Sequence, residues 1–162
     1  MENPLVAIMM GSQSDLETMK EAAQLLKEFD VMFEMRVLST HRAAEDTAQY
    51  AKELEGRGIK VVIAGAGGAA ALAGIVAAYS PLPVIGIPIE TTALNGMDSL
   101  LSTVQMPPGV PVATVAIGKN GAKNSAFLAL RILGLTDKAI QKKLQEYKKA
   151  QRDKIVNTKV SL

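Results

Sequence analysis

The stretch VVIAGAGGAAALAGIVAAYSPLPVIGIPI, residues 61–89, contains no charged residue and decides the fold. An uncharged run of this length raises the question of a transmembrane helix. Glycines and prolines divide it instead into a strand, a turn, a helix and a second strand. No bias of basic residues at its flanks marks an orientation in a membrane. The run therefore predicts a buried strand–helix–strand unit, and we expect no membrane partner.

Short apolar runs recur at regular intervals on both sides of this unit. Parallel strands buried on both faces have this continuous apolar pattern. Five strands are predicted: Leu5–Met10, Phe33–Leu38, Val61–Ala64, Pro83–Ile87 and Val112–Ile117. Helical patterns occupy Asp15–Phe29, Ala44–Arg57, Ala69–Tyr79, Met97–Val104, Gly121–Leu133 and Thr136–Val156, the last with Thr136 as its expected N-cap. The alternation predicts a single α/β domain over residues 1–162, with a doubly wound five-stranded parallel sheet in three α/β/α layers and a C-terminal helical extension.

Composition excludes several classes of protein. The 18 Lys and Arg residues nearly balance the 16 Asp and Glu residues, so the net charge of +2 does not indicate a nucleic-acid partner. The basic residues from Lys138 to Lys159 lie on a predicted helix and are interpreted as a solvated face. The chain has no Cys and one His, so we expect no disulfide framework and no metal. The N-terminal residues lack the features of a signal peptide, and we expect a cytoplasmic protein.

The apolar content points to self-association. The chain is 48% hydrophobic but only 4% aromatic, and its mean hydropathy is +0.16. Small apolar residues permit close approach of backbones, and excess apolar surface on a small domain tends to be covered by a partner. The predicted helix Ala69–Tyr79 has no polar face. We therefore expect a homo-oligomer with this helix at a subunit interface.

The loop after the first predicted strand carries the residues Gly11-Ser12-Gln13-Ser14-Asp15. In open parallel sheets, ligands bind beyond the carboxyl ends of the strands. Two hydroxyls and the N-terminus of the following helix would suit a phosphate, and Asp15 could accept hydrogen bonds from a ribose. Ordinary helix capping by Ser14 explains the same residues equally well. This loop alone leaves both interpretations open.

The loop after the second predicted strand, Ser39-Thr40-His41-Arg42, holds the only histidine of the chain. An imidazole can give and take a proton near neutral pH. Arg42 supplies a planar pair of donors for a phosphate or a carboxylate. A capped turn with exposed side chains is the alternative. Because the two polar loops would lie on adjacent strands, the pattern favours a functional site.

The loop after the third predicted strand is rich in glycine. Residues 65–70 match the dinucleotide pattern G-x-G-x-x-A, and Glu90 follows twenty residues after Ala70. That pattern normally follows the first strand of its fold, so a smaller ligand is favoured here. Asp46, Asp98 and Asp137 are dispersed and indicate no metal cluster. Lys123 and Asn124 are interpreted as surface residues.

Taken in order, these motifs resemble the class I PurE family, the N5-carboxyaminoimidazole ribonucleotide mutases of purine (IMP) biosynthesis. The resemblance covers nearly the whole chain and includes residues 10–15, 39–42, 64–70, 98–102 and 104–107. It implies a flavodoxin-like fold, assembly as an octamer and no cofactor. It also implies an isomerase that moves a carboxylate from the exocyclic amine of an aminoimidazole ribonucleotide to carbon 4 of the ring. The C-terminal helix, about 136–156, would pack on a neighbouring subunit.

The resemblance also assigns roles to individual residues. His41 would be the proton carrier, with carbon dioxide trapped between decarboxylation and recarboxylation. The phosphoribosyl group and the base would be bound by Ser12, Ser14, Asp15, Ser39, Arg42, Ala66, Gly67 and Leu72.

The chain departs from the family pattern at two places. The family usually has Ser-Ala-His-Arg-Thr-Pro, and this chain has Thr40 in place of the Ala and Ala43-Ala44 in place of Thr-Pro. It also has an active-site His and a Pro where this chain has Ala71 and Ala73. Besides the mutase, the departures leave open a direct aminoimidazole ribonucleotide carboxylase that uses carbon dioxide, and a catalytically silent ribonucleotide-binding homologue. A dinucleotide-binding domain is disfavoured by the first loop.

Overall fold

A computed structural model describes residues 3–160 and contains one five-stranded parallel sheet. Its strands are β1 (Val6–Met10), β2 (Phe33–Val37), β3 (Val61–Gly67), β4 (Val84–Ile89) and β5 (Ala113–Thr114). Their order is β2-β1-β3-β4-β5, and every neighbouring pair is parallel. This is the flavodoxin-like order. The chain places β2 on one side of β1 and then adds β3, β4 and β5 on the other side, so the order of strands reverses between β1 and β3. The predicted fold class is confirmed.

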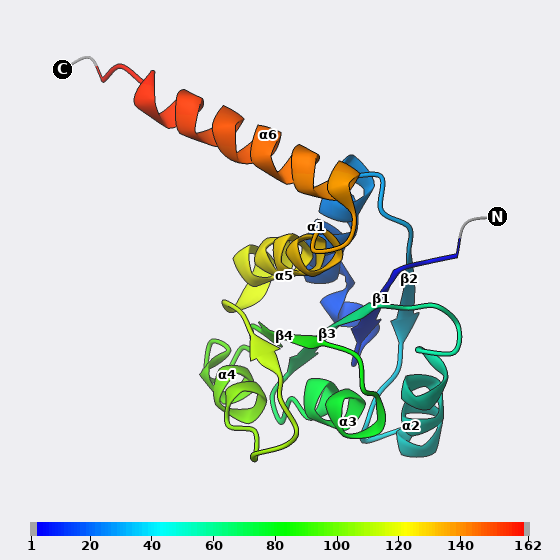
Figure 1. The fold of residues 1–162 in the computed structure, drawn as a ribbon. Coiled ribbons are helices and arrows are strands. Elements are labelled where there is room, and N and C mark those ends of the chain that lie inside the picture. The colour runs from blue at the N-terminus through cyan, green and yellow to red at the C-terminus, as the bar shows by residue number, and fades with distance from the viewer. Residues whose placement is uncertain (1–2, 161–162) are drawn as a thin grey trace.

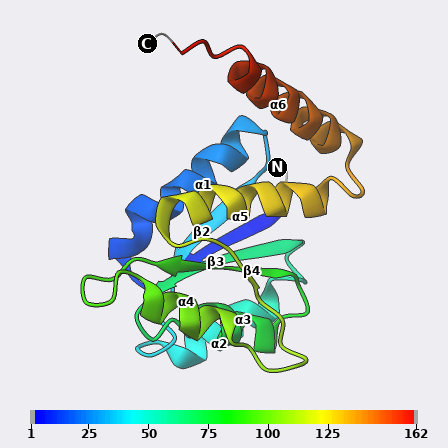
Figure 2. The same cartoon turned by 90° about the vertical axis from the view of Figure 1, so that its left-hand side faces the viewer.

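Helices cover both faces of the sheet. On one face lie α1 (Leu16–Glu28), which follows the short 3-10 helix η1 (Gln13–Asp15), and α5 (Gly118–Leu133). On the other face lie α2 (Ala44–Glu53), α3 (Leu72–Tyr79) and α4 (Met97–Val104). Figures 1 and 2 show these layers from two directions, with the sheet between them. Because each right-handed crossover places its helix on one face, the reversal between β1 and β3 fills both faces.

Alternate residues of each central strand enter different halves of the core. On β1, Val6, Ile8 and Met10 pack in the cluster under α1 and α5. Ala7 and Met9 pack in the cluster under α2 and α3. Since both faces of β1 are buried, a continuous apolar run was the correct signal for this strand. β2 differs because it is an edge strand: it carries Glu34 and Arg36 and is partly exposed.

Several predicted boundaries were wrong by a few residues. β3 continues through Gly67, and α3 begins only at Leu72 because a bend at residues 68–69 and two further loop residues separate them. α2 ends at Glu53 rather than at Arg57. The N-cap of the last helix is Asp137, whose carboxylate accepts hydrogen bonds from the N–H groups of Ala139 and Ile140 at 2.8 and 3.1 Å. Thr136, the expected cap, bonds back to the carbonyl of Leu133 instead.

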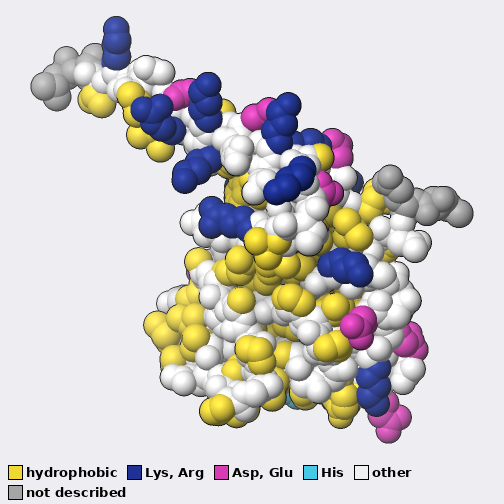
Figure 3. All heavy atoms as spheres, in the orientation of Figure 1, with side chains coloured by type: hydrophobic (Ala, Val, Ile, Leu, Met, Phe, Trp, Pro, Cys, Tyr) yellow, Lys and Arg dark blue, Asp and Glu magenta, His cyan; other side chains and the backbone are white. Residues whose placement is uncertain are grey.

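The last helix, α6 (Lys138–Val156), projects away from the domain (Figure 1). Its base is held by Lys143, whose ammonium donates to Asp30 Oδ2 at 2.6 Å and to the carbonyl of Phe29 at 3.2 Å. Its outer part carries many Lys and Arg side chains on the face shown in Figure 3. Within residues 3–160, no helix has both the length and the apolar character needed to cross a membrane.

Candidate active site

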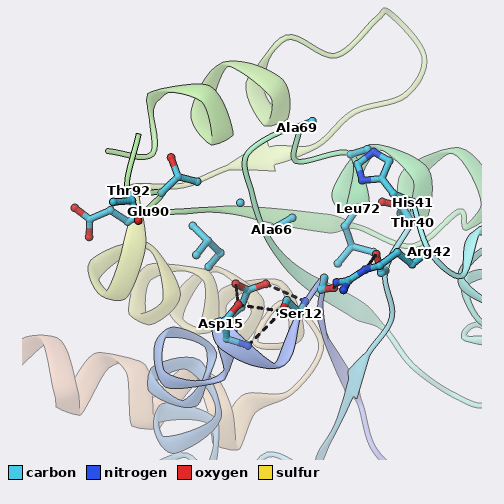
Figure 4. Close-up of a pocket in the computed structure, with 17 residues that line it drawn as sticks. Ser12, Asp15, Thr40, His41, Arg42, Ala66, Ala69, Leu72, Glu90 and Thr92 are labelled. Carbon is cyan, nitrogen blue, oxygen red and sulfur yellow. Dashed lines mark hydrogen bonds between the residues drawn. The ribbon is translucent and has the colours of Figure 1, made fainter. Parts of the chain in front are cut away.

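A cavity of about 540 Å³ lies at the carboxyl ends of the strands, around the β1/β3 reversal. Loops after β1, β2, β3 and β4 form its walls (Figure 4). A volume of this size suits a small molecule, since such sites range over roughly 300–1,000 Å³. All nine site residues proposed from the sequence line it: Ser12, Ser14, Asp15, Ser39, His41, Arg42, Ala66, Gly67 and Leu72.

The loop after β1 is shaped by reciprocal hydrogen bonds. Ser12 Oγ accepts a hydrogen bond from the N–H of Ser14 at 3.3 Å, and Asp15 Oδ2 accepts one from the N–H of Ser12 at 3.1 Å. This is a capping box around η1, with Ser12 as the N-cap. Of the two interpretations left open for this loop, the capping one named Ser14, whereas the structure places Ser12 at the cap. Ser14 instead bonds through its hydroxyl to Ser12 Oγ at 2.9 Å and to Asp15 Oδ1 at 3.3 Å. The three side chains form one polar unit at the cavity wall.

Asp15 is the buried member of this unit, with 8% of its surface exposed. Burial raises the pKa of its carboxyl, and hydrogen bonds from Ser12 and Ser14 oppose that rise. Burial has the larger effect because removing a carboxylate from water disfavours its charged form. A buried, partly satisfied carboxylate that faces a cavity has unused acceptor capacity for a ligand hydroxyl.

The loop after β2 joins the first wall through Arg42. Its guanidinium donates to Ser39 Oγ at 3.2 Å and to the carbonyl of Gly11 at 3.3 Å. These bonds leave further N–H groups of the fork available to an anion. His41 is exposed, and its imidazole has no hydrogen-bond partner among residues 3–160. In Figure 4 the imidazole stands at the side of the cavity formed by Ala69 and Leu72.

The glycine-rich loop after β3 forms the back wall with little side-chain volume. Ala66, Gly67, Ala69, Ala71 and Leu72 all contribute to the lining. Gly68 adopts a left-handed backbone conformation with φ of +67°, which favours glycine. Position 71 presents only a methyl group to the cavity.

A fourth wall of the cavity was not predicted from the sequence. Ile89, Glu90, Thr91 and Thr92, at and after the end of β4, also line the cavity. Glu90 was considered only as part of a dinucleotide pattern. The signal was available, because a polar triplet directly after an apolar parallel strand marks a carboxyl end.

Other candidates lie elsewhere. Lys123 forms an ion pair with Glu21 at 3.3 Å and does not line the cavity. Asn124 lines a separate groove between α5 and α6. Across residues 3–160, no group of three or more His, Cys, Asp or Glu side chains is placed to hold a metal ion.

Comparisons with known proteins agree on one family. The AIR carboxylase family model matches residues 5–154. The N5-carboxyaminoimidazole ribonucleotide mutase of Pyrococcus horikoshii is 58% identical over 154 residues, which cover 95% of this chain and 86% of that protein. The Bacillus subtilis mutase is 57% identical over 143 residues, 88% of each chain. The crystal structure of Treponema denticola PurE superposes with a TM-score of 0.86 at 34% identity and covers 94% of both chains.

Proposed function

Because this chain belongs to the AIR carboxylase family, we propose that it is an enzyme of purine biosynthesis, an N5-carboxyaminoimidazole ribonucleotide mutase. It is an isomerase: the carboxylate leaves the exocyclic amine and returns to carbon 4 of the same imidazole ring. The mutases of Pyrococcus horikoshii and Bacillus subtilis, at 58% and 57% identity over most of the chain, support this assignment.

One observation carries the proposal. The only imidazole of the chain lines the same cavity as an anion-binding set made of Arg42 and the Ser12–Ser14–Asp15 unit. Arg42 and the two serines would hold the phosphate of the ribonucleotide, since guanidinium and hydroxyl groups are good phosphate donors. Asp15 would accept hydrogen bonds from the ribose hydroxyls. Ala66 and Gly67 offer a flat surface against which the base can lie.

His41 would carry one proton through the reaction. Breaking the carbamate bond requires a proton at the departing nitrogen, and the imidazolium of His41 supplies it. Carbon 4 of the ring then attacks the released carbon dioxide. The neutral imidazole removes the proton from carbon 4, which restores the aromatic ring and the imidazolium. General acid–base catalysis of this kind contributes about 10²- to 10⁴-fold.

Carbon dioxide must stay in place between the two steps. The apolar wall made by Ala66, Ala69, Ala71 and Leu72 would hold it, because carbon dioxide is small and carries no charge. Excluding water from that wall also protects the intermediate from loss to solvent. No organic cofactor or metal enters this mechanism.

Direct carboxylation of aminoimidazole ribonucleotide is the second candidate. It is favoured by the apolar side chains at positions 71 and 73, where the class I pattern has His and Pro. With Ala71 at the wall, His41 would act with no second imidazole near it. A direct carboxylase would take carbon dioxide from solution into the same space.

Two parallel assays distinguish these reactions. The purified chain is incubated with N5-carboxyaminoimidazole ribonucleotide, and separately with aminoimidazole ribonucleotide and bicarbonate, and formation of 4-carboxyaminoimidazole ribonucleotide is followed in both. A mutase forms product much faster from the carbamate at low bicarbonate. Faster product formation in the second assay would establish the carboxylase, and no product in either would leave a silent binding protein.

We further propose a cytoplasmic homo-octamer in which α6 packs on a neighbouring subunit. Leu135, Ile155 and Val156 near α6 are 79%, 75% and 67% exposed, which is apolar surface that an assembly would cover. Leu94, Met97, Leu101 and Val104 around α4 are exposed as well. The predicted interface role of α3 stays a prediction, since Leu72, Ala73 and Val76 are already buried within the chain.

The absence of Cys from the chain suits a reducing cytoplasm. Light scattering at micromolar concentration should give about eight times the 17.2 kDa chain mass, and a monomer would overturn this part.

A further inference from the structure

The helix α4 holds two walls of the cavity although none of its residues, 97–104, lines it. Ser99 of this helix is fully buried, with 0% of its surface exposed, and its side chain makes two hydrogen bonds. Ser99 Oγ accepts from the N–H of Gly68 at 2.9 Å and donates to the carbonyl of Ile89 at 2.6 Å. Gly68 follows β3, and Ile89 ends β4. One hydroxyl group therefore ties together the ends of two neighbouring strands.

The carbonyl of Gly68 is held by the same helix. Ser102 Oγ donates to it at 3.3 Å and to the carbonyl of Asp98 at 2.7 Å. Ser99 and Ser102 are three residues apart and thus share a helix face. The residues on either side of Gly68, Gly67 and Ala69, both line the cavity. The position of this wall is consequently set by two serines that lie behind it.

The wall after β4 is held from α4 too. The hydroxyl of Thr91, which lines the cavity, donates to the carboxylate of Asp98, with distances of 2.8 and 3.1 Å to its two oxygens. The first turns of α4 therefore fix the β3 loop and the β4 loop relative to one another.

We propose that Ser99 is a positioning residue for the reaction, acting through the peptide of Gly68. This inference rests on the proposed mutase function. The wall at Gly67 sets where the imidazole ring of the substrate lies relative to His41, so a shift of this wall changes the distance over which the proton moves. Displacing reacting groups by about 1 Å can cost on the order of 100-fold in rate. The phosphate site is formed by other loops, after β1 and β2, so affinity depends little on Ser99.

The test is Ser99→Ala. Without the hydroxyl, the N–H of Gly68 and the carbonyl of Ile89 lose their shared partner, and the loop relaxes. We expect kcat per folded enzyme to fall by about 10- to 100-fold, while KM stays within about 3-fold. A role limited to stability would lower the melting temperature but leave kcat of the folded fraction unchanged.

Two control variants each remove a buried hydroxyl group, as Ser99→Ala does. Ser125 in α5 is also 0% exposed, and its Oγ donates to the carbonyl of Ala122 at 2.7 Å, away from the cavity. Thr103 in α4 is buried, and its hydroxyl donates to the carbonyl of Ser99 at 2.7 Å. Ser125→Ala and Thr103→Val should lose stability and keep kcat.

The outcomes distinguish a failure of this inference from a failure of the proposed mutase function. A wild-type chain that does not convert the carbamate overturns the proposed function. An active wild type whose kcat is unchanged in Ser99→Ala, or is lowered equally in both controls, overturns the inference alone. If Ser99→Ala does not fold, Ser102→Ala replaces it, because Ser102 is exposed and also bonds to Gly68. A loss of kcat of about 2-fold or more at unchanged KM supports the positioning role. An unchanged kcat rejects it.

Discussion

Replacing His41 by Asn tests the proposed proton transfer separately from folding and binding. Asn has a similar size and can donate a hydrogen bond, but it cannot give and take a proton. Among the cavity-lining residues the other ionisable side chains are Asp15, Arg42 and Glu90. Guanidinium stays protonated at neutral pH, and carboxyls ordinarily stay ionised. Few alternative carriers therefore exist, and turnover should fall by about 10²- to 10⁴-fold, or about 3–5 kcal/mol in the activation barrier.

The fold should tolerate this change. His41 is exposed and has no hydrogen-bond partner among the described residues, so the free energy of unfolding should change by no more than about 0.5 kcal/mol. For a chain of 162 residues that corresponds to a shift of about 1–2 °C in the melting temperature.

The assay measures kcat on the carbamate substrate, affinity for the carboxylated product by calorimetry, and thermal unfolding for the same preparation. Asp46→Asn is the matched control, because Asp46 lies exposed in the first turn of α2 and does not line the cavity. Retained turnover in His41→Asn would refute the mechanism and point to Asp15, whose raised pKa makes it the nearest substitute. Affinity lost together with turnover would mean that His41 is mainly a ligand contact.

Two further predictions concern the polar walls. Arg42→Ala should weaken ribonucleotide binding by about 1.5–3 kcal/mol, the range for a hydrogen bond to a charged group. For a ligand that lacks the phosphate, calorimetry should find the same affinity in wild type and variant. An equal loss of affinity for both ligands would show that Arg42 does not contact the phosphate. Burial raises the pKa of Asp15, so its contribution to stability is present at acidic pH and is lost as the pH rises through that pKa. Asp15→Asn, which carries no charge, should therefore resist unfolding by urea better than wild type at pH 7 but not near pH 3. Its ligand affinity should fall by about 10-fold or more. A lower free energy of unfolding in the variant at pH 7 would contradict the stability prediction.

The loops of the site were predictable because a local rule determines where they lie. Polar residues that follow a buried parallel strand are carried to the carboxyl edge of the sheet, whatever the exact packing. Residues 11–15 and 39–42 satisfy this rule with hydroxyl, carboxyl, imidazole and guanidinium groups. The triplet after β4, residues 90–92, satisfies it equally and was overlooked because Glu90 had been fitted to a dinucleotide pattern. That omission was one of interpretation and not of missing information.

Contacts between distant residues were beyond sequence reasoning. Gly65 was grouped with the glycines of the turn, yet it lies inside β3, where a Cβ would collide with Met19 Sδ of α1. The capping of η1 by Ser12 rather than Ser14 depends on backbone geometry over three residues. Ser99 entered the sequence analysis only as part of the motif 98–102, and its hydrogen bond to Gly68 spans 31 positions.

The sequence by itself determined the parallel α/β fold, the edge of the sheet that carries the candidate site and the polar groups that line it, because periodicity and residue chemistry are local properties. The tertiary structure alone decided that Arg42 reaches the carbonyl of Gly11, that burial raises the pKa of Asp15, and that α4 holds the β3 and β4 loops from behind. These properties arise from packing between segments far apart in the chain, and burial and hydrogen-bond geometry take their values only once those segments meet.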